Sequence, residues 1–225
     1  EAAIVIGGAP NIGYTSVSPL PIDVDEFTVA GGLAGEPVEL VKCKTIDVEV
    51  PAFAEIVIEG EISTEELEPE APFGEATGYV GEQQMNLFLT VKGITHRREP
   101  IWQSFISQFA PSEASVIKQV AWDQVLPVRL RNDLNMPYVR RVVVHYNNGS
   151  NRYVVLQLAK ADRTEVWRAL EAMPQKFPDV SKIVVAVDED IDPQNANLVN
   201  WAISFRTQPH RDIRIVMSPF PDNMD

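Results

Sequence analysis

The clearest structural signal in the chain is the alternating stretch Ile46-Asp47-Val48-Glu49-Val50, followed after Pro51 by Glu55-Ile56-Val57-Ile58-Glu59. Apolar and acidic residues alternate with a period of two in both runs, which is typical of strands that bury one face. The same alternation over residues 85–96 predicts another strand of one antiparallel sheet, and short apolar runs predict strands at 4–6, 38–41 and 101–105. Such a sheet with few helices favours a split β-barrel.

Between two of these strands lies the hexapeptide Glu70-Ala71-Pro72-Phe73-Gly74-Glu75. Pro72 and Gly74 disfavour a helix, so we expect a kinked loop whose rigid centre fixes where the two carboxylates point. Neighbouring carboxylates push their proton affinities apart, as acid–base chemistry near neutral pH requires. A solvated acidic turn is the alternative interpretation of the same residues.

The surrounding charge is one-sided, because residues 45–91 contain eleven acids and no Lys or Arg. Exposed acids need only water. We expect any buried acid to need a cation from elsewhere, either an arginine or a metal ion. The acidic loop is therefore predicted to be half of a site.

Composition limits the function. A net charge of −13 disfavours binding to nucleic acid and to anionic membranes. The single cysteine, Cys43, excludes an internal disulfide and fits a reducing cytoplasm, and its strand-like setting predicts a buried apolar role. No stretch approaches the roughly 20 apolar residues that span a bilayer.

Three further features each have two interpretations. The segment Ser16-Val17-Ser18-Pro19-Leu20-Pro21 is predicted to be an extended loop, either a plain connector or a contact surface for a ligand. The acids of Asp23-Val24-Asp25-Glu26 suit Mg or Mn as hard oxygen ligands, or form a solvated turn. His96 is predicted to end a strand at the surface rather than to bind a metal.

The second half of the chain has a different pattern. Ser112 is predicted to cap a helix that lacks the glutamate of a full capping box and that kinks or ends at Pro127. Beyond it the order β-β-α-β-α-β suggests an α+β layer with helices on one face, built from strands 142–144, 153–158, 183–187 and 213–216 and from helices 162–173 and 195–205. Trp167 and Trp201 are predicted to pack in the core, and the acids of residues 188–192 to form a solvated loop.

Several ordered motifs resemble the UbiD family of prenylated-flavin-dependent decarboxylases. They are residues 50–60, the hexapeptide 70–75 with Gly78-Tyr79, Asp25-Glu26-Phe27 with Ala30-Gly31-Gly32-Leu33, and Glu39-Leu40-Val41-Lys42-Cys43. The resemblance covers almost the whole chain. Ala71 departs from the glycine usual at its position but leaves both acids in place.

The resemblance implies a fold and a division of the chain. The fold class is α+β: residues 1–110 form part of a flavin-reductase-like split β-barrel, 111–132 a linker helix, and 133–225 a small α+β oligomerisation domain. Family members are typically much longer, so we expect this chain to be a fragment, a processed chain or part of a larger protein. The family's arginine and its remaining metal ligands are expected upstream of Glu1.

The resemblance also implies a site and its chemistry. Glu75 is the expected proton donor, with Glu70 as its partner. Glu26 would hold a divalent ion, Mn or Mg, and K⁺ is a further candidate. The cofactor would be prenylated FMN, contacted by the residues Ser16, Val17, Ser18, Pro19 and Lys176.

The implied activity is reversible, non-oxidative decarboxylation of an aromatic or α,β-unsaturated carboxylic acid by a cytoplasmic homo-oligomer, dimeric or hexameric. A flavin prenyltransferase would supply the cofactor. Two alternatives are a non-catalytic fragment or assembly subunit, and a flavin reductase or oxidase that uses unmodified flavin. We expect the 225 residues alone to be inactive.

Overall fold

The computed structural model describes every residue except 19, 76–77, 106–108, 146–151 and 217–225. The chain divides into two compact units, Glu1–Lys118 and Gln119–Asp225, each described here by itself. Within the described residues, no helix combines the length and the apolar character needed to cross a membrane.

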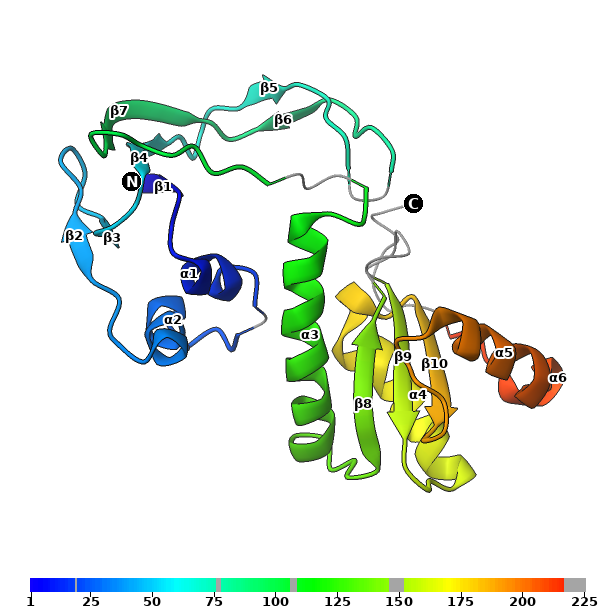
Figure 1. Ribbon diagram of the computed structural model, residues 1–225. Helices are drawn as coiled ribbons and strands as arrows, with labels where there is room; N and C mark the ends of the chain where they lie inside the picture. Colours follow the sequence, from blue (N-terminus) through cyan, green and yellow to red (C-terminus); the bar gives the residue numbers. More distant parts are fainter. Residues whose placement is uncertain (19, 76–77, 106–108, 146–151, 217–225) are drawn as a thin grey trace. The chain divides into compact units, whose positions relative to one another are not determined.

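The first unit is built on a three-stranded antiparallel sheet with β4 in the middle (Figure 1). Its strands are β1 (Ala2–Ile6), β4 (Ile56–Ile62) and β7 (Leu89–His96). Strands β1 and β4 confirm the strands predicted at 4–6 and 55–59, whereas β7 covers only residues 89–96 of the strand predicted over 85–96. The split barrel that this pattern favoured stays a prediction, because the described strands form separate small sheets.

The two faces of this sheet differ sharply. On one face Ile4, Ile58 and Ile94 lie side by side in register across the three strands. Ile4 is 48% exposed and Ile94 58%, so this apolar row is largely uncovered. On the other face Val57 and Glu59 are buried.

Two short hairpins complete the strands of this unit: β2 (Leu40–Lys42) with β3 (Glu49–Pro51), and β5 (Glu68–Glu70) with β6 (Gln84–Asn86). The predicted strands at 38–41 and 46–50 are therefore shorter than expected. The strand predicted at 101–105 is wrong, because residues 101–105 form no strand and pair with none of the strands among the described residues.

Two helices that the pattern did not predict pack together, α1 (Pro10–Thr15) and α2 (Glu26–Ala34). The side chain of Asn11 joins them by donating to the Ala30 carbonyl at 2.9 Å. Asp25 caps α2 by accepting from the backbone N–H groups of Phe27 and Thr28. An aspartate at this position is a preferred N-cap, so Asp25 is the residue from which α2 could have been predicted.

Helix α3 (Glu113–Asn132) begins as predicted and runs on through Pro127. The capping glutamate is absent from this helix, as predicted. Ser115 takes its place, because the Ser112 N–H donates to Ser115 Oγ at 2.9 Å and the Ser115 N–H donates to Ser112 Oγ at 3.2 Å.

The second unit contains a three-stranded sheet in the order β10-β9-β8. Strand β9 pairs antiparallel with β8 and parallel with β10. The elements after α3 are β8 (Val139–Val144), β9 (Tyr153–Leu158), α4 (Arg163–Lys176), the short 3₁₀ helix η2 (Pro178–Val180), β10 (Ile183–Asp188), α5 (Ala196–Arg206) and α6 (Pro209–Asp212).

Helices cover both faces of this sheet, so the prediction of helices on one face is wrong. Val154 and Leu156 of β9 join a core with α3 and α4, including Leu126 and Met173. Val155, between them, points to the opposite face and packs against α5. A strand buried on both faces reads as a nearly continuous apolar run, and residues 153–158 follow this pattern with Gln157 as the exception.

Two other predictions for this unit fail. Trp201 is 44% exposed and stacks on Phe205 and Arg206 rather than packing in the core. Residues 213–216 form no strand within the part of the chain that the structure describes.

Candidate active-site loop

Glu70 is positioned by a regular β-ladder. It ends β5 and lies opposite Gln84 of β6, while Glu68 lies opposite Asn86. The side-chain amide of Asn86 donates to the Glu70 carboxylate, diagonally across the two strands. Such diagonal neighbours are within reach of long side chains. The hairpin therefore fixes both the backbone and the carboxylate of Glu70.

Glu75 lies at the tip of the same hairpin. The Gly81 N–H donates to the Phe73 carbonyl at 3.0 Å, and the Glu75 N–H donates to the Tyr79 carbonyl at 2.8 Å. The Gly78 N–H then donates to the Glu75 carbonyl at 3.0 Å and closes the turn. The kinked loop predicted from Pro72 and Gly74 is thus a tight antiparallel turn.

Gly78 is required by this turn. Its φ of +88° lies in the left-handed region that side-chain-bearing residues avoid. A Cβ atom at Gly78 would also lie 2.9 Å from Cδ2 of Phe109.

The carboxylates of Glu70 and Glu75 are both exposed. The side chain of Glu75 runs beside Gly81, where a Cβ atom would lie 3.4 Å from Glu75 Oε1. Neither acid lines the cavity of about 1650 Å³ or the cavity of about 750 Å³ in the second unit. In this chain the two acids are therefore presented to solvent rather than enclosed.

The serines of the predicted cofactor loop close helix α1 instead of extending from it, so the extended conformation predicted there is wrong for residues 16–18. Ser16 Oγ donates to the Gly13 carbonyl at 2.9 Å, and Ser18 Oγ donates to the Tyr14 carbonyl at 2.8 Å. Both hydroxyl protons are engaged, so only the oxygen lone pairs are available to a ligand. Val17 continues this turn, and Pro19 lies outside the described residues.

Glu26 is the first residue of α2 and is exposed. Its neighbour Asp25 is used as the N-cap, and the hydrogen bond from the Thr28 hydroxyl, with those from the backbone, holds the pKa of Asp25 below its ordinary value. Across the described ranges, no group of three or more His, Cys, Asp or Glu residues could hold a metal ion. Glu26 is therefore a single candidate ligand.

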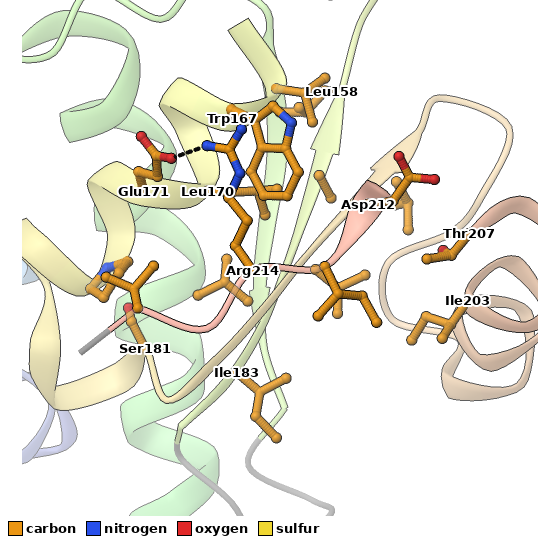
Figure 2. Close-up of a pocket in the computed structure, with 18 of the residues that line it drawn as sticks. Leu158, Trp167, Leu170, Glu171, Ser181, Ile183, Ile203, Thr207, Asp212 and Arg214 are labelled. Atoms are coloured by element: carbon orange, nitrogen blue, oxygen red, sulfur yellow. Dashed lines mark hydrogen bonds and ion pairs between the residues drawn. The ribbon is translucent and has the colours of Figure 1, made fainter. Parts of the chain in front are cut away.

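Lys176 lies in the second unit, as the last residue of α4. It is exposed and lines a cavity of about 750 Å³ together with Arg163, Arg168 and Arg214. Glu171 lines the same cavity and pairs with Arg214 (Figure 2), and Arg163 pairs with Asp212, so part of this positive charge is already neutralised.

Glu59 corrects the prediction that a buried acid needs a cation. Its carboxylate is 1% exposed and accepts from the Lys44 N–H, the Thr45 N–H and the Thr45 hydroxyl, at 2.7–3.1 Å. The Thr45 hydroxyl contributes most to lowering the pKa of Glu59. Three neutral donors thus stabilise the charge, and the Lys44 ammonium adds only the smallest effect. Burial, with a smaller effect from the Glu59 charge, raises the pKa of the nearby Cys43 thiol; the side chain is half-buried and follows β2, so it is less buried than predicted.

Glu55 is a second acid whose contacts sequence reasoning missed. It pairs with Arg97 at 3.1 Å and accepts from the Ile101 N–H at 3.1 Å. The register of β4 and β7 implies this ion pair, because Ile56 lies opposite His96 and Glu55 therefore lies next to Arg97.

The acidic loop at 188–192 binds arginines. Asp190 forms two hydrogen bonds to Arg206, at 2.8 and 2.6 Å, and Asp192 pairs with Arg141 at 3.0 Å. The Arg206 side-chain hydrogen bonds lower the pKa of Asp190. These contacts explain the acids without a metal ion.

Comparison with known proteins agrees with this architecture. Residues 1–108 match the 3-octaprenyl-4-hydroxybenzoate carboxy-lyase Rift-related domain, and residues 124–221 match the C-terminal domain of the same family. The chain belongs to the UbiD family.

Individual relatives share the fold over part of their length. The evolved dimeric form of the UbiD-class enzyme HmfF from Pelotomaculum thermopropionicum, solved in complex with prFMN, is 35% identical with a TM-score of 0.85, over 96% of this chain and 49% of that one. The vanillic acid decarboxylase of Sedimentibacter hydroxybenzoicus in its open form is 28% identical with a TM-score of 0.81, over 93% and 45%.

A sequence relative has the same partial overlap. The uncharacterized protein sll0936 of Synechocystis is 31% identical over 227 residues, which cover 100% of this chain and 45% of that protein. The chain thus spans about half the length of the relatives it matches.

Proposed function

We propose that this chain supplies acid–base residues to a prenylated-FMN-dependent enzyme that reversibly decarboxylates an aromatic or α,β-unsaturated carboxylic acid without net oxidation. The observation that carries the proposal is the hairpin that presents Glu70 and Glu75 in a chain of the UbiD family. Two similar structures support the cofactor and the reaction, one solved with prFMN and one a vanillic acid decarboxylase.

The donor types in the chain fit such a cofactor. Glu26 offers an exposed carboxylate of the kind that Mn and Mg prefer, and Lys176 offers a cation suited to a phosphate. The oxygens of Ser16 and Ser18 keep lone pairs for a donor on the cofactor or for a metal ion. When bound, prenylated FMN would accept the electron pair left as the bond to the carboxylate breaks.

Glu75 is the proposed acid. When carbon dioxide departs, the substrate carbon that carried it needs a proton, and Glu75 in its protonated form would donate one to that carbon. In the carboxylation direction Glu75 would remove the same proton. Its exposed position lets it exchange protons with water between turnovers.

Glu70 is the proposed partner of Glu75. Its carboxylate is held by Asn86 and therefore has a defined orientation on the same hairpin. An arginine between the two acids, as the family resemblance implies, would have to come from outside this chain.

A second proposal follows from the exposure of both acids and from the partial overlap with the relatives. The 225 residues by themselves act as a non-catalytic part of such an enzyme, and turnover needs polypeptide that covers the loop. Flavin absorbance distinguishes the two proposals, because a chain that acts only as an assembly subunit has no flavin absorbance of its own.

The test is expression of this chain together with the polypeptide that covers the loop and with a flavin prenyltransferase, followed by the absorption spectrum and the mass of the bound flavin. Turnover is then measured against aryl, heteroaryl and enoic acids, and bound Mn, Mg and K⁺ by elemental analysis. Glu75→Gln is expected to keep the cofactor and to abolish turnover. Glu82→Gln, an exposed acid on the same segment, is the matched control and should leave the rate unchanged. Near-normal turnover by Glu75→Gln would refute its role as the acid.

A further inference from the structure

The two acids of the candidate loop are held in different ways by the strand that returns from its tip. The carboxylate of Glu70 accepts a hydrogen bond from the side-chain amide of Asn86 in β6. The carboxylate of Glu75 accepts from no donor among the described residues and lies beside Gly81 instead. The two acids therefore have unequal support on one hairpin.

The contact between Asn86 and Glu70 follows from the register of the hairpin. Asn86 lies opposite Glu68, and Glu70 is its diagonal neighbour on the same face. A carboxylate only accepts hydrogen bonds, so the nitrogen end of the amide faces Glu70. Protonation of Glu70 would weaken this bond, because a neutral carboxyl is a poorer acceptor than a charged one.

Gly81 provides the space that Glu75 occupies. The backbone hydrogen bonds of the turn pair Glu75 with Tyr79 and Phe73 with Gly81, which places residues 75 and 81 on the same face. A Cβ atom at Gly81 would lie 3.4 Å from Oε1 and 3.6 Å from Cγ of Glu75. These are ordinary contact distances, so a methyl group fits beside the acid, whereas a branched side chain would displace it.

We infer that Asn86 and Gly81 are positioning residues that give the two acids different roles, an inference that rests on the proposed function. Asn86 holds Glu70 in one orientation, and Glu70 transfers no proton. Gly81 leaves room for Glu75 to carry the proton without breaking a hydrogen bond.

The proton balance shows why both residues matter. As carbon dioxide leaves, the O–H bond of Glu75 breaks and a C–H bond forms at the substrate carbon, so Glu75 becomes a carboxylate and takes its next proton from water. A Glu70 side chain released from Asn86 could rotate toward Glu75 and compete for that proton. Asn86 prevents this competition by engaging the Glu70 carboxylate.

The first test uses the 225-residue chain without any flavin. With ¹⁵N-labelled asparagine, the side-chain amide signal of Asn86 is identified by its loss in Asn86→Leu. In Glu70→Leu this signal is expected to shift and its protons to exchange faster with water, whereas Glu75→Gln should leave it unchanged. An Asn86 signal that stays the same in Glu70→Leu would overturn the role of Asn86, whatever the cofactor.

The second test measures turnover by the cofactor-loaded enzyme assembled with the polypeptide that covers the loop. Asn86→Leu removes the donor at similar size and is expected to lower kcat about ten-fold with KM unchanged. Asn86→Asp also adds a repelling charge and should lower kcat further, while Asn86→Gln keeps the amide and should recover part of the rate. Gln84→Leu is the matched control and should keep the wild-type rate, because Gln84 lies directly opposite Glu70 but donates no hydrogen bond to it among the described residues.

Gly81 is tested by a size series in the same enzyme. Gly81 has no positive φ, so a side chain there meets no backbone strain. Gly81→Ala should keep a near-normal rate, and Gly81→Val should lower kcat about 100-fold by displacing the carboxyl group of Glu75. Unchanged hydrogen exchange at the Glu75 N–H in Gly81→Val would show that the turn is still folded.

The outcomes separate this inference from the proposed function. Near-normal turnover by Glu75→Gln would refute the proposed function. If Glu75→Gln is inactive while Asn86→Leu keeps the wild-type kcat, or loses no more activity than Gln84→Leu, the role of Asn86 is refuted and the proposed function stands. A wild-type kcat in Gly81→Val would refute the role of Gly81 in the same way.

Discussion

Replacing Gly78 by alanine should destabilise the turn that carries Glu75. Gly78 has a φ of +88°, and an alanine there must adopt a left-handed conformation, which costs about 1–2 kcal/mol. The added Cβ would also lie 2.9 Å from Phe109 Cδ2. Overpacking costs about 1–3 kcal/mol in a closed core, but Phe109 is 60% exposed and can rotate away, so we take the low end of that range. The sum is about 2–3 kcal/mol.

Amide hydrogen exchange measures this effect locally. The Glu75 and Gly81 N–H groups donate within the turn, so their exchange reports its opening. A loss of 2–3 kcal/mol corresponds to exchange about 30- to 150-fold faster, or to complete loss of protection if the turn is less stable than that.

Two alanine variants serve as controls for the backbone cost and the steric cost of Gly78→Ala. Gly35 has a φ of +78° with open space around it, so Gly35→Ala should show the conformational cost alone, about 1–2 kcal/mol at the end of α2. Gly13 lies inside α1 with open space and no positive φ, so Gly13→Ala should stabilise that helix by about 0.5–1 kcal/mol. If Gly78→Ala exchanged no faster than wild type at Glu75, the reasoning about this turn would be wrong.

Three other perturbations have defined outcomes. Because the pKa of Glu59 is lowered in the folded protein, its stabilising effect is fully present above its ordinary pKa and is lost as the pH falls through the lowered value. The urea midpoint of unfolding should therefore drop from pH 6 to pH 3. In Glu59→Gln the midpoint should depend less on pH. Burial raises the pKa of Asp123, so its contribution to stability is fully present below its ordinary pKa and is lost as the pH rises through the raised value. Asp123→Asn can still accept the hydrogen bond from the Val144 N–H. This variant should be more stable than wild type at pH 7 and equally stable at pH 3. Met173 is fully buried, so Met173→Ala should lower the free energy of unfolding by about 2–5 kcal/mol in a denaturant titration. Leu198 is 39% exposed, and Leu198→Ala should lower it much less.

Strands with a clear period were predictable, whereas strands that depend on a partner were not. The alternation at residues 55–59 predicted β4, and the apolar run at 183–187 predicted β10. Residues 101–105 and 213–216 also contain β-forming residues but pair with no strand among the described residues, and a strand needs a partner for its backbone groups. Composition alone does not say whether that partner exists.

The candidate loop was predictable in outline. Pro72 and Gly74 indicated a kinked loop between two strands, and the structure has one there. The hydrogen bond from Asn86 to Glu70 was not predictable, because it depends on the register of β5 and β6. The burial of Glu59 was missed for a similar reason, since the donors on Lys44 and Thr45 come from a different hairpin.

The isoleucine row across β1, β4 and β7 has a practical consequence for anyone who handles this chain. Water meets a continuous hydrocarbon strip formed by Ile4, Ile58 and Ile94, and strips of this kind on two molecules attract each other as the protein is concentrated. Dilute conditions or a mild detergent should keep the isolated chain dispersed. Light scattering of Ile94→Lys against wild type would show how much of the self-association comes from this face.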